Sequence, residues 1–140
     1  MKTRLTRSLM TLVAAGAVTS VALADHWTGP KEVAKAAHAF EDAAKHLHKS
    51  IHAVSEDSPL VEEVHGLAKS AEHFHKAVEK GTTYEHVVKD YRKIEHDYAH
   101  FEKALKDDHD VHHDDHVVAD AKKMKQAFGH LQGHMSGRRD

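Results

Sequence analysis

Hydrophobic residues recur at alternating spacings of three and four along four successive stretches of the chain. At 3.6 residues per turn, this spacing places them on one face of an α-helix, with polar residues around the rest of its circumference. The four stripes run over Val33–Val54, Leu60–Val78, Tyr84–Leu105 and Val117–Met135. We therefore expect an all-α protein in which four helices, joined by short connections, pack as an antiparallel up-and-down four-helix bundle.

Residues that favour helix ends separate these stripes. Pro30 and Pro59 suit the first turns of the first and second helices, and Ser58 is a suitable N-cap for the second. Gly81 is typical of a helix C-terminus. Thr82, followed three residues later by a glutamate, predicts a capping box at the start of the third helix.

A repeat of 27 residues supports four helices of similar length. Leu47, Phe74, Phe101 and Phe128 are 27 residues apart, and the segments HLHKSI, HFHKAV and HFEKAL around the first three are similar. A chance similarity among helices rich in Ala, Lys and His is the alternative. On either interpretation we expect these four large side chains in the core.

The first 24 residues have the pattern of a secretory signal peptide. Lys2, Arg4 and Arg7 precede a largely apolar run over residues 9–21, and Ala22-Leu23-Ala24 fits a cleavage site. A retained membrane anchor is the alternative, but the apolar run is short for a spanning helix. We expect a single mature domain over residues 25–140, periplasmic or extracellular, with no stable membrane insertion after signal cleavage.

Charge and cysteine content narrow the classes of function. The chain has no cysteine, which excludes disulfides and haem attachment through C-x-x-C-H. Residues 25–140 hold 17 of the basic residues and all 22 acidic ones, which gives a net charge of −5 with neutral histidines. Protonation of all 17 histidines would bring that charge to +12. No strongly basic patch indicates a nucleic-acid partner.

The histidines are the main candidates for chemistry. At about 100° per residue, most of them point away from the apolar stripes and toward solvent. Two imidazoles four residues apart on a helix lie on one face and can bind one metal ion. Pairs with this spacing are His48/His52, His96/His100, His109/His113, His112/His116 and His130/His134.

The segment DDHDVHHDDH, residues 107–116, is the densest candidate site, and the fourth helix should begin within it, between Asp110 and Asp115. Neutral imidazole suits zinc, copper or nickel. A polar helix start capped by acidic residues, with exposed histidines, is the alternative interpretation. The candidate metal ligands are His109, His112, His113, His116 and Asp115, with His48, His52, His96 and His100 as further candidates.

The expected topology would gather many histidines at one end of the bundle. The end of the first helix, the start of the second, the end of the third and the start of the fourth meet there. Ten histidines belong to this end: His46, His48, His52, His65, His96, His100, His109, His112, His113 and His116.

Known cofactor bundles fit the sequence poorly. Di-iron proteins carry inward-facing Glu-x-x-His motifs on separate helices, whereas both such motifs here lie on the second helix. A hemerythrin-like site would need His96 and His100, which face away from their stripe. A haem bundle like cytochrome b562 needs an axial methionine near the chain start, but Met124 and Met135 both belong to the last helix. We expect no haem, no catalytic residues and no enzymatic activity.

The stretch HLHKSIHAVSEDSPLVEEVHGLAKSAEHFHKAVEKGTTYEHVVKDY resembles secreted bacterial proteins that look like small His-rich four-helix bundles, with a similar signal peptide and a His/Asp-rich turn before the last helix. The resemblance covers most of residues 32–131 and rests on helix patterning and histidine placement. It implies the fold and an extracytoplasmic location, and it implies no activity.

These features predict an exported protein that binds or buffers copper, zinc or nickel ions through surface histidines. The metal ions are the partners that the sequence indicates, and it identifies no protein partner. A pH-responsive interaction or chaperone-like envelope protein without specific metal binding is an alternative, because acidification through the histidine pKa would reverse the net charge. A purely structural envelope protein is a third interpretation.

Overall fold

The computed structural model describes residues 30–136, so the expected signal peptide lies outside the described residues. The elements are α1 (Pro30–Val54), α2 (Pro59–Glu79), α3 (Tyr84–Asp107), α4 (His109–His112) and α5 (Asp115–Ser136). The described range contains no strand, which confirms the all-α prediction. The expected count of four helices was wrong there, because a one-turn helix, α4, stands between α3 and α5. Within the same range, no helix is both long and apolar enough to cross a membrane.

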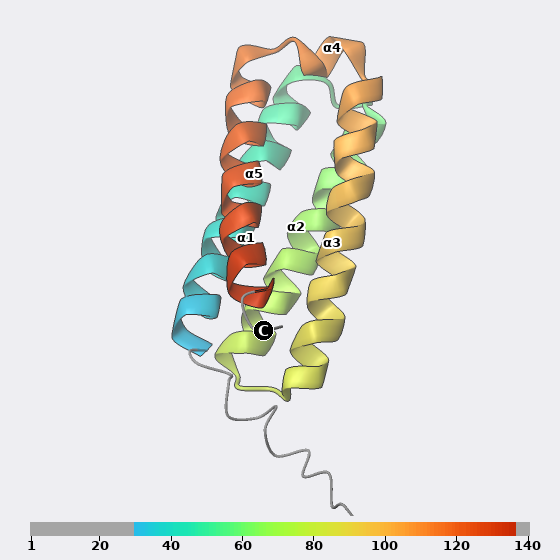
Figure 1. The fold of residues 1–140 in the computed structure, drawn as a ribbon. Coiled ribbons are helices and arrows are strands. Elements are labelled where there is room, and N and C mark those ends of the chain that lie inside the picture. The colour runs from blue at the N-terminus through green and yellow to red at the C-terminus, as the bar shows by residue number, and fades with distance from the viewer. Residues whose placement is uncertain (1–29, 137–140) are drawn as a thin grey trace, which may run out of the picture.

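The four long helices lie side by side, with α4 at one end where the chain passes from α3 to α5 (Figure 1). Helix α1 packs along α2 on one side and along α5 on the other, and α2 also packs along α3. Side chains of α3 and α5 meet as well, since the rings of Tyr98 and Phe128 stack with centroids 4.1 Å apart.

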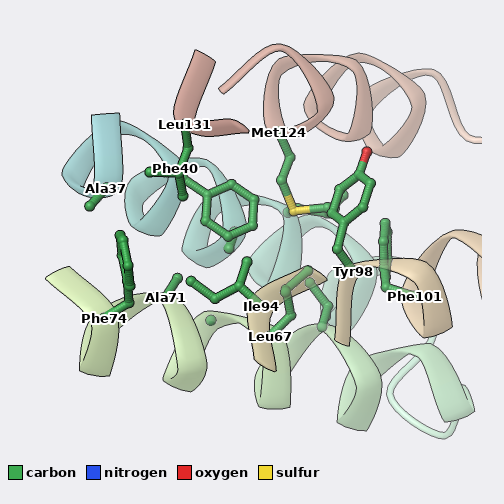
Figure 2. Close-up of a cluster of buried hydrophobic side chains, with 14 of the residues drawn as sticks. Ala37, Phe40, Leu67, Ala71, Phe74, Ile94, Tyr98, Phe101, Met124 and Leu131 are labelled. Carbon is green, nitrogen blue, oxygen red and sulfur yellow. The ribbon is translucent and has the colours of Figure 1, made fainter. Parts of the chain in front are cut away.

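The core is built from the predicted apolar stripes (Figure 2). Leu47, Phe74 and Phe101 are fully or almost fully buried, as the 27-residue repeat predicts. Phe128, the fourth member, is only half-buried, although its ring contacts those of Phe40 and Tyr98. Each stripe thus faces the other helices, and the opposite face of each helix is left to polar side chains.

Two ends of the stripes depart from prediction. Val54 is 41% exposed and Tyr84 is 38% exposed. Val54 is the last residue of α1 and Tyr84 is the first of α3, so both lie at the margin of the packed helices. A regular spacing continues to the end of a helix, but burial requires a neighbouring helix opposite that end.

The turn between α2 and α3 follows from its sequence with a shift of one residue. Gly81 has φ +65° and ends α2 in a Schellman motif, in which Gly81 N–H donates to Val78 O and Thr82 N–H donates to Ala77 O. The prediction of Thr82 as N-cap was wrong, because its hydroxyl donates to Ala77 O at 2.9 Å. Thr83 is the cap, and its Oγ1 accepts from His86 N–H at 3.4 Å.

The opposite end of the molecule is held by caps that contact each other. Ser58 caps α2 as predicted, with its Oγ accepting from Leu60 N–H at 3.2 Å. The Ser58 hydroxyl also donates to Asp108 Oδ2 at 2.6 Å, and Asp108 Oδ1 accepts from Val111 N–H at 3.1 Å to cap α4. Val111 is fully buried, so α4 presents one apolar side chain to the end of the core.

Candidate metal centres

The described histidines lie on the surface, as the helical pattern predicts. Of the 16 histidines among residues 30–136, 14 are exposed, and only His48 and His75 are half-buried. A metal site among the described histidines would therefore lie at the surface and not in the core. Within residues 30–136, two groups place three ligand atoms within 4.8 Å of one another: His38/Glu41/His75 and His73/His86/Asp90.

The first group joins α1 to α2. Glu41, 7% exposed, accepts a hydrogen bond from Lys45 through Oε1, and its Oε2 lies 2.7 Å from His75 Nδ1. Burial raises the pKa of Glu41, but the hydrogen bonds to Lys45 and His75 outweigh it and hold the pKa below its usual value. The His38 ring lies 5.0 Å from that of His75. This carboxylate is already paired, so a metal ion would have to replace its contact with His75.

The second group joins α2 to α3 next to the turn at residues 80–83. Asp90 Oδ2 lies 3.1 Å from His73 Nδ1 and 3.3 Å from His86 Nε2. This oxygen is buried, and it accepts no hydrogen bond from residues 30–136, although both imidazole nitrogens lie within ion-pair distance of it. The Thr83 cap fixes the first turn of α3, where His86 lies, and Asp90 follows one turn later on the same face.

Two of the three ligand spacings in the second group are close to those of ligands around one metal ion. Zinc binds imidazole nitrogen at about 2.0–2.1 Å and carboxylate oxygen at about 2.0–2.2 Å, so a nitrogen and an oxygen of one tetrahedral site lie about 3.3–3.5 Å apart. The two nitrogen–oxygen distances to Asp90, 3.1 and 3.3 Å, are close to this separation. A cation between the three atoms would also satisfy the buried oxygen, which carries a cost where it has no partner.

Each group takes one ligand from α2, and these two ligands, His73 and His75, are two residues apart. His73 contacts Asp90 of α3, and His75 contacts Glu41 of α1. Phe74 between them is fully buried. Side chains two residues apart on a helix point in directions that differ by about 200° around its axis, so the HFH sequence presents one imidazole to each neighbouring helix.

The segment 107–116 is divided between capping and exposed histidines. Asp108 caps α4, and Asp114 Oδ1 caps α5 by accepting from His116 and Val117 N–H at 2.9 and 3.0 Å. Hydrogen bonds from the Ser58 hydroxyl and from the Val111 backbone lower the pKa of Asp108. Asp108 and Asp114 are therefore helix caps, as the alternative interpretation of this segment predicts.

The structure brings some of the predicted ligands in this segment together. The ring of His113 lies 4.7 Å from that of His109 and 5.5 Å from that of His112. His116 and Asp115 lie in the first turn of α5, beyond the turn at residues 113–114. Among the residues that the structure describes, no three ligand atoms of this segment lie within 4.8 Å of one another.

Two other predicted pairs have their rings close together, one on α3 and one on α1. The rings of His96 and His100 are 4.4 Å apart, and those of His48 and His52 are 6.2 Å apart. His48 also lies 5.0 Å from His65 across α1 and α2. Burial first, and then the charges of His65 and His52, lower the pKa of His48, which favours the neutral imidazole that binds metals.

The sequence did not single out either three-ligand group. His86 and Asp90 carry a local signal, a histidine and a carboxylate four residues apart, and His38 and Glu41 are three apart. Only the packing of α2 against its two neighbours adds the third ligand in each case.

No family model, no curated protein and no solved structure matches the chain.

Proposed function

We propose that residues 25–140 form an exported protein that binds and buffers transition-metal ions at histidine–carboxylate sites between its helices, without catalytic activity. We further propose that the four long helices form an antiparallel up-and-down bundle, with α4 as a cap at one end. Turns of four residues at 55–58 and 80–83 join α1 to α2 and α2 to α3, which are packed neighbours, and this supports reversal of direction at each turn.

The observation that carries the metal proposal is the arrangement around Asp90. A buried carboxylate oxygen without a hydrogen bond lies 3.1 and 3.3 Å from two imidazole nitrogens of different helices. Two imidazoles and one carboxylate suit zinc, copper or nickel better than calcium or magnesium, which prefer oxygen ligands alone. We assign the tightest binding event to His73, His86 and Asp90.

Buffering, as distinct from binding of one ion, is supported by the number of weaker candidates. The His38/Glu41/His75 group requires a hydrogen bond to be broken before a metal can bind, which lowers its affinity. Imidazole pairs such as His96/His100 and His109/His113 offer two nitrogens each. These sites would fill in sequence as the metal concentration rises.

Calorimetric titration of the metal-free protein with Zn²⁺ and Cu²⁺ tests this assignment. In the variant His86→Gln the tightest event should be lost, because the site keeps only one imidazole. The matched control is His46→Gln, which removes one exposed imidazole that belongs to neither group. The same tight event in the wild type and in His86→Gln, or no event tighter than that of isolated imidazoles, would overturn the proposal.

A second candidate function is pH-dependent interaction through surface charge. The exposure of 14 of the 16 described histidines favours it, because exposed imidazoles can exchange protons with the solvent and so change the surface charge. This function requires no metal. It would therefore persist in His86→Gln and would depend on pH alone.

A further inference from the structure

A groove lies beside the proposed metal site, between α2 and α3. Its volume is about 430 Å³, and it is lined by Gly66, Lys69, Ser70, His73, Asp90 and Lys93. His73 and Asp90 belong both to the groove and to the His73/His86/Asp90 group. A ligand in the groove would therefore lie next to the metal ion.

The number of protein ligands leaves room for an external one. Zinc sites that are closed by the protein have four protein ligands, whereas sites with three keep a position for water or another ligand. The His73/His86/Asp90 group supplies three. Its remaining position can be reached from the groove, because two of its ligands form part of the groove wall.

The charges around the groove make it attractive to anions only when a metal is bound. Lys93 Nζ donates to Asp97 Oδ2 at 2.6 Å and to Ser70 Oγ at 2.7 Å, which holds its ammonium group in the wall. Without a metal, Lys69 and Lys93 are balanced by Asp90 and Asp97. A divalent ion would leave a net charge of +2 on this face.

Gly66 keeps the groove open on the α2 side. Glycine is unfavourable in the interior of a helix. Close packing does not require a glycine at position 66, since an added Cβ would meet no atom within 4 Å. A longer side chain at this position would extend into the groove without displacing the core. The position thus offers a way to fill the groove and leave the metal ligands unchanged.

We propose that the His73/His86/Asp90 site and this groove together form a metal-dependent site for a phosphate group, free or as a monoester. One phosphate oxygen would occupy the remaining position on the metal, and the ammonium groups of Lys69 and Lys93 would pair with the others. Lysine is a common phosphate ligand and acts as a point charge. This inference rests on the proposed metal-binding function and specifies the second ligand of that site.

The test uses the protein loaded with one equivalent of Zn²⁺ or Co²⁺, titrated with inorganic phosphate and, separately, with phenyl phosphate. Phosphate should change the visible spectrum of the Co²⁺ form, because the ligand joins the coordination sphere. Binding should be absent in the metal-free protein. Tighter binding of phenyl phosphate than of inorganic phosphate would indicate an esterified ligand, and the reverse would indicate free phosphate.

Three variants locate the site. Lys69→Met should weaken phosphate binding about tenfold, as expected for loss of one charged contact, with zinc affinity retained. Gly66→Leu should abolish it by filling the groove, with helicity and zinc affinity retained. Lys89→Met removes an exposed lysine of α3 that does not line the groove and should leave phosphate binding unchanged.

The outcomes separate this inference from the proposed function. Absence of zinc binding would overturn both. Zinc binding with no effect of phosphate on the Co²⁺ spectrum, or removal of zinc by phosphate, would overturn the phosphate site alone. Phosphate binding that is independent of metal, or equal in the wild type and Gly66→Leu, would place the ligand elsewhere and overturn it as well.

Discussion

Replacement of Phe74 by alanine tests the placement of both candidate metal centres, because this residue separates His73 from His75 along α2. The Phe74 side chain is fully buried, and its ring lies 6.2 Å from that of Tyr91. Phe→Ala changes at buried positions cost about 3–5 kcal/mol, from lost transfer energy and the cavity left behind. The change His73→Ala, one residue away, removes a side chain that is 67% exposed and should cost less than about 0.5 kcal/mol.

The assay is urea denaturation of the metal-free proteins, followed by far-ultraviolet circular dichroism. With a slope of about 2 kcal/mol per molar urea, the Phe74→Ala midpoint should fall by about 2 M, and that of His73→Ala by less than about 0.3 M. Should Phe74→Ala be unfolded in buffer, Phe74→Leu provides the comparison, with a loss of about 1–2 kcal/mol expected from its smaller cavity. Similar midpoints for the His73 and Phe74 variants would refute the orientation of α2 on which both metal groups depend.

Three further predictions concern pH, metal and capping. Asp108→Ala should destabilise the protein by about 1 kcal/mol through loss of the α4 cap. Since the folded pKa of Asp108 is below its usual 3.8, this stabilisation is present above about pH 4 and is lost as the pH falls through the folded pKa. Thermal melts of both proteins at pH 3 and pH 6 would show the difference. Zn²⁺ at 100 times its dissociation constant should stabilise the wild type by about 2.7 kcal/mol and raise its melting temperature, whereas the His73→Gln/His86→Gln protein should gain much less; equal gains would exclude this site. Potentiometric titration of the metal-free protein should show uptake of many protons between about pH 7.5 and 5.5 and a reversal of electrophoretic direction, and uptake of only a few would show that most imidazoles are held in hydrogen bonds.

The helices could be predicted from the sequence because each hydrophobic stripe is regular and is bounded by local end signals. Ser58 and Gly81 have the predicted roles because capping depends on residues a few positions away. Helix α4 could not be predicted in the same way. It depends on Val111 reaching the core and on a hydrogen bond between Ser58 and Asp108, 50 residues apart.

The candidate site was less predictable for a related reason. The surface position of the histidines follows from helical geometry, and three of the five pairs four residues apart have their rings 4.4 to 6.2 Å apart. The three-ligand groups require contacts between helices, and these depend on how α2 is rotated against its neighbours. Nothing local in the sequence near His73 indicates that Asp90 will be its partner.

The two ends of the molecule are closed in different ways, which affects how each end opens. Near α4, the Ser58–Asp108 hydrogen bond couples the caps of two helices, so neither helix start can fray without disturbing the other. At the other end, the turn after α2 is held by bonds within its own few residues, through Gly81, Thr82 and Thr83. In native-state hydrogen exchange the first end would open as one cooperative unit, and the second would open by independent fraying of α2 and α3. The His73/His86/Asp90 group joins the same two helices, so a bound ion would add a side-chain cross-link between α2 and α3 to the connection that their four-residue turn provides.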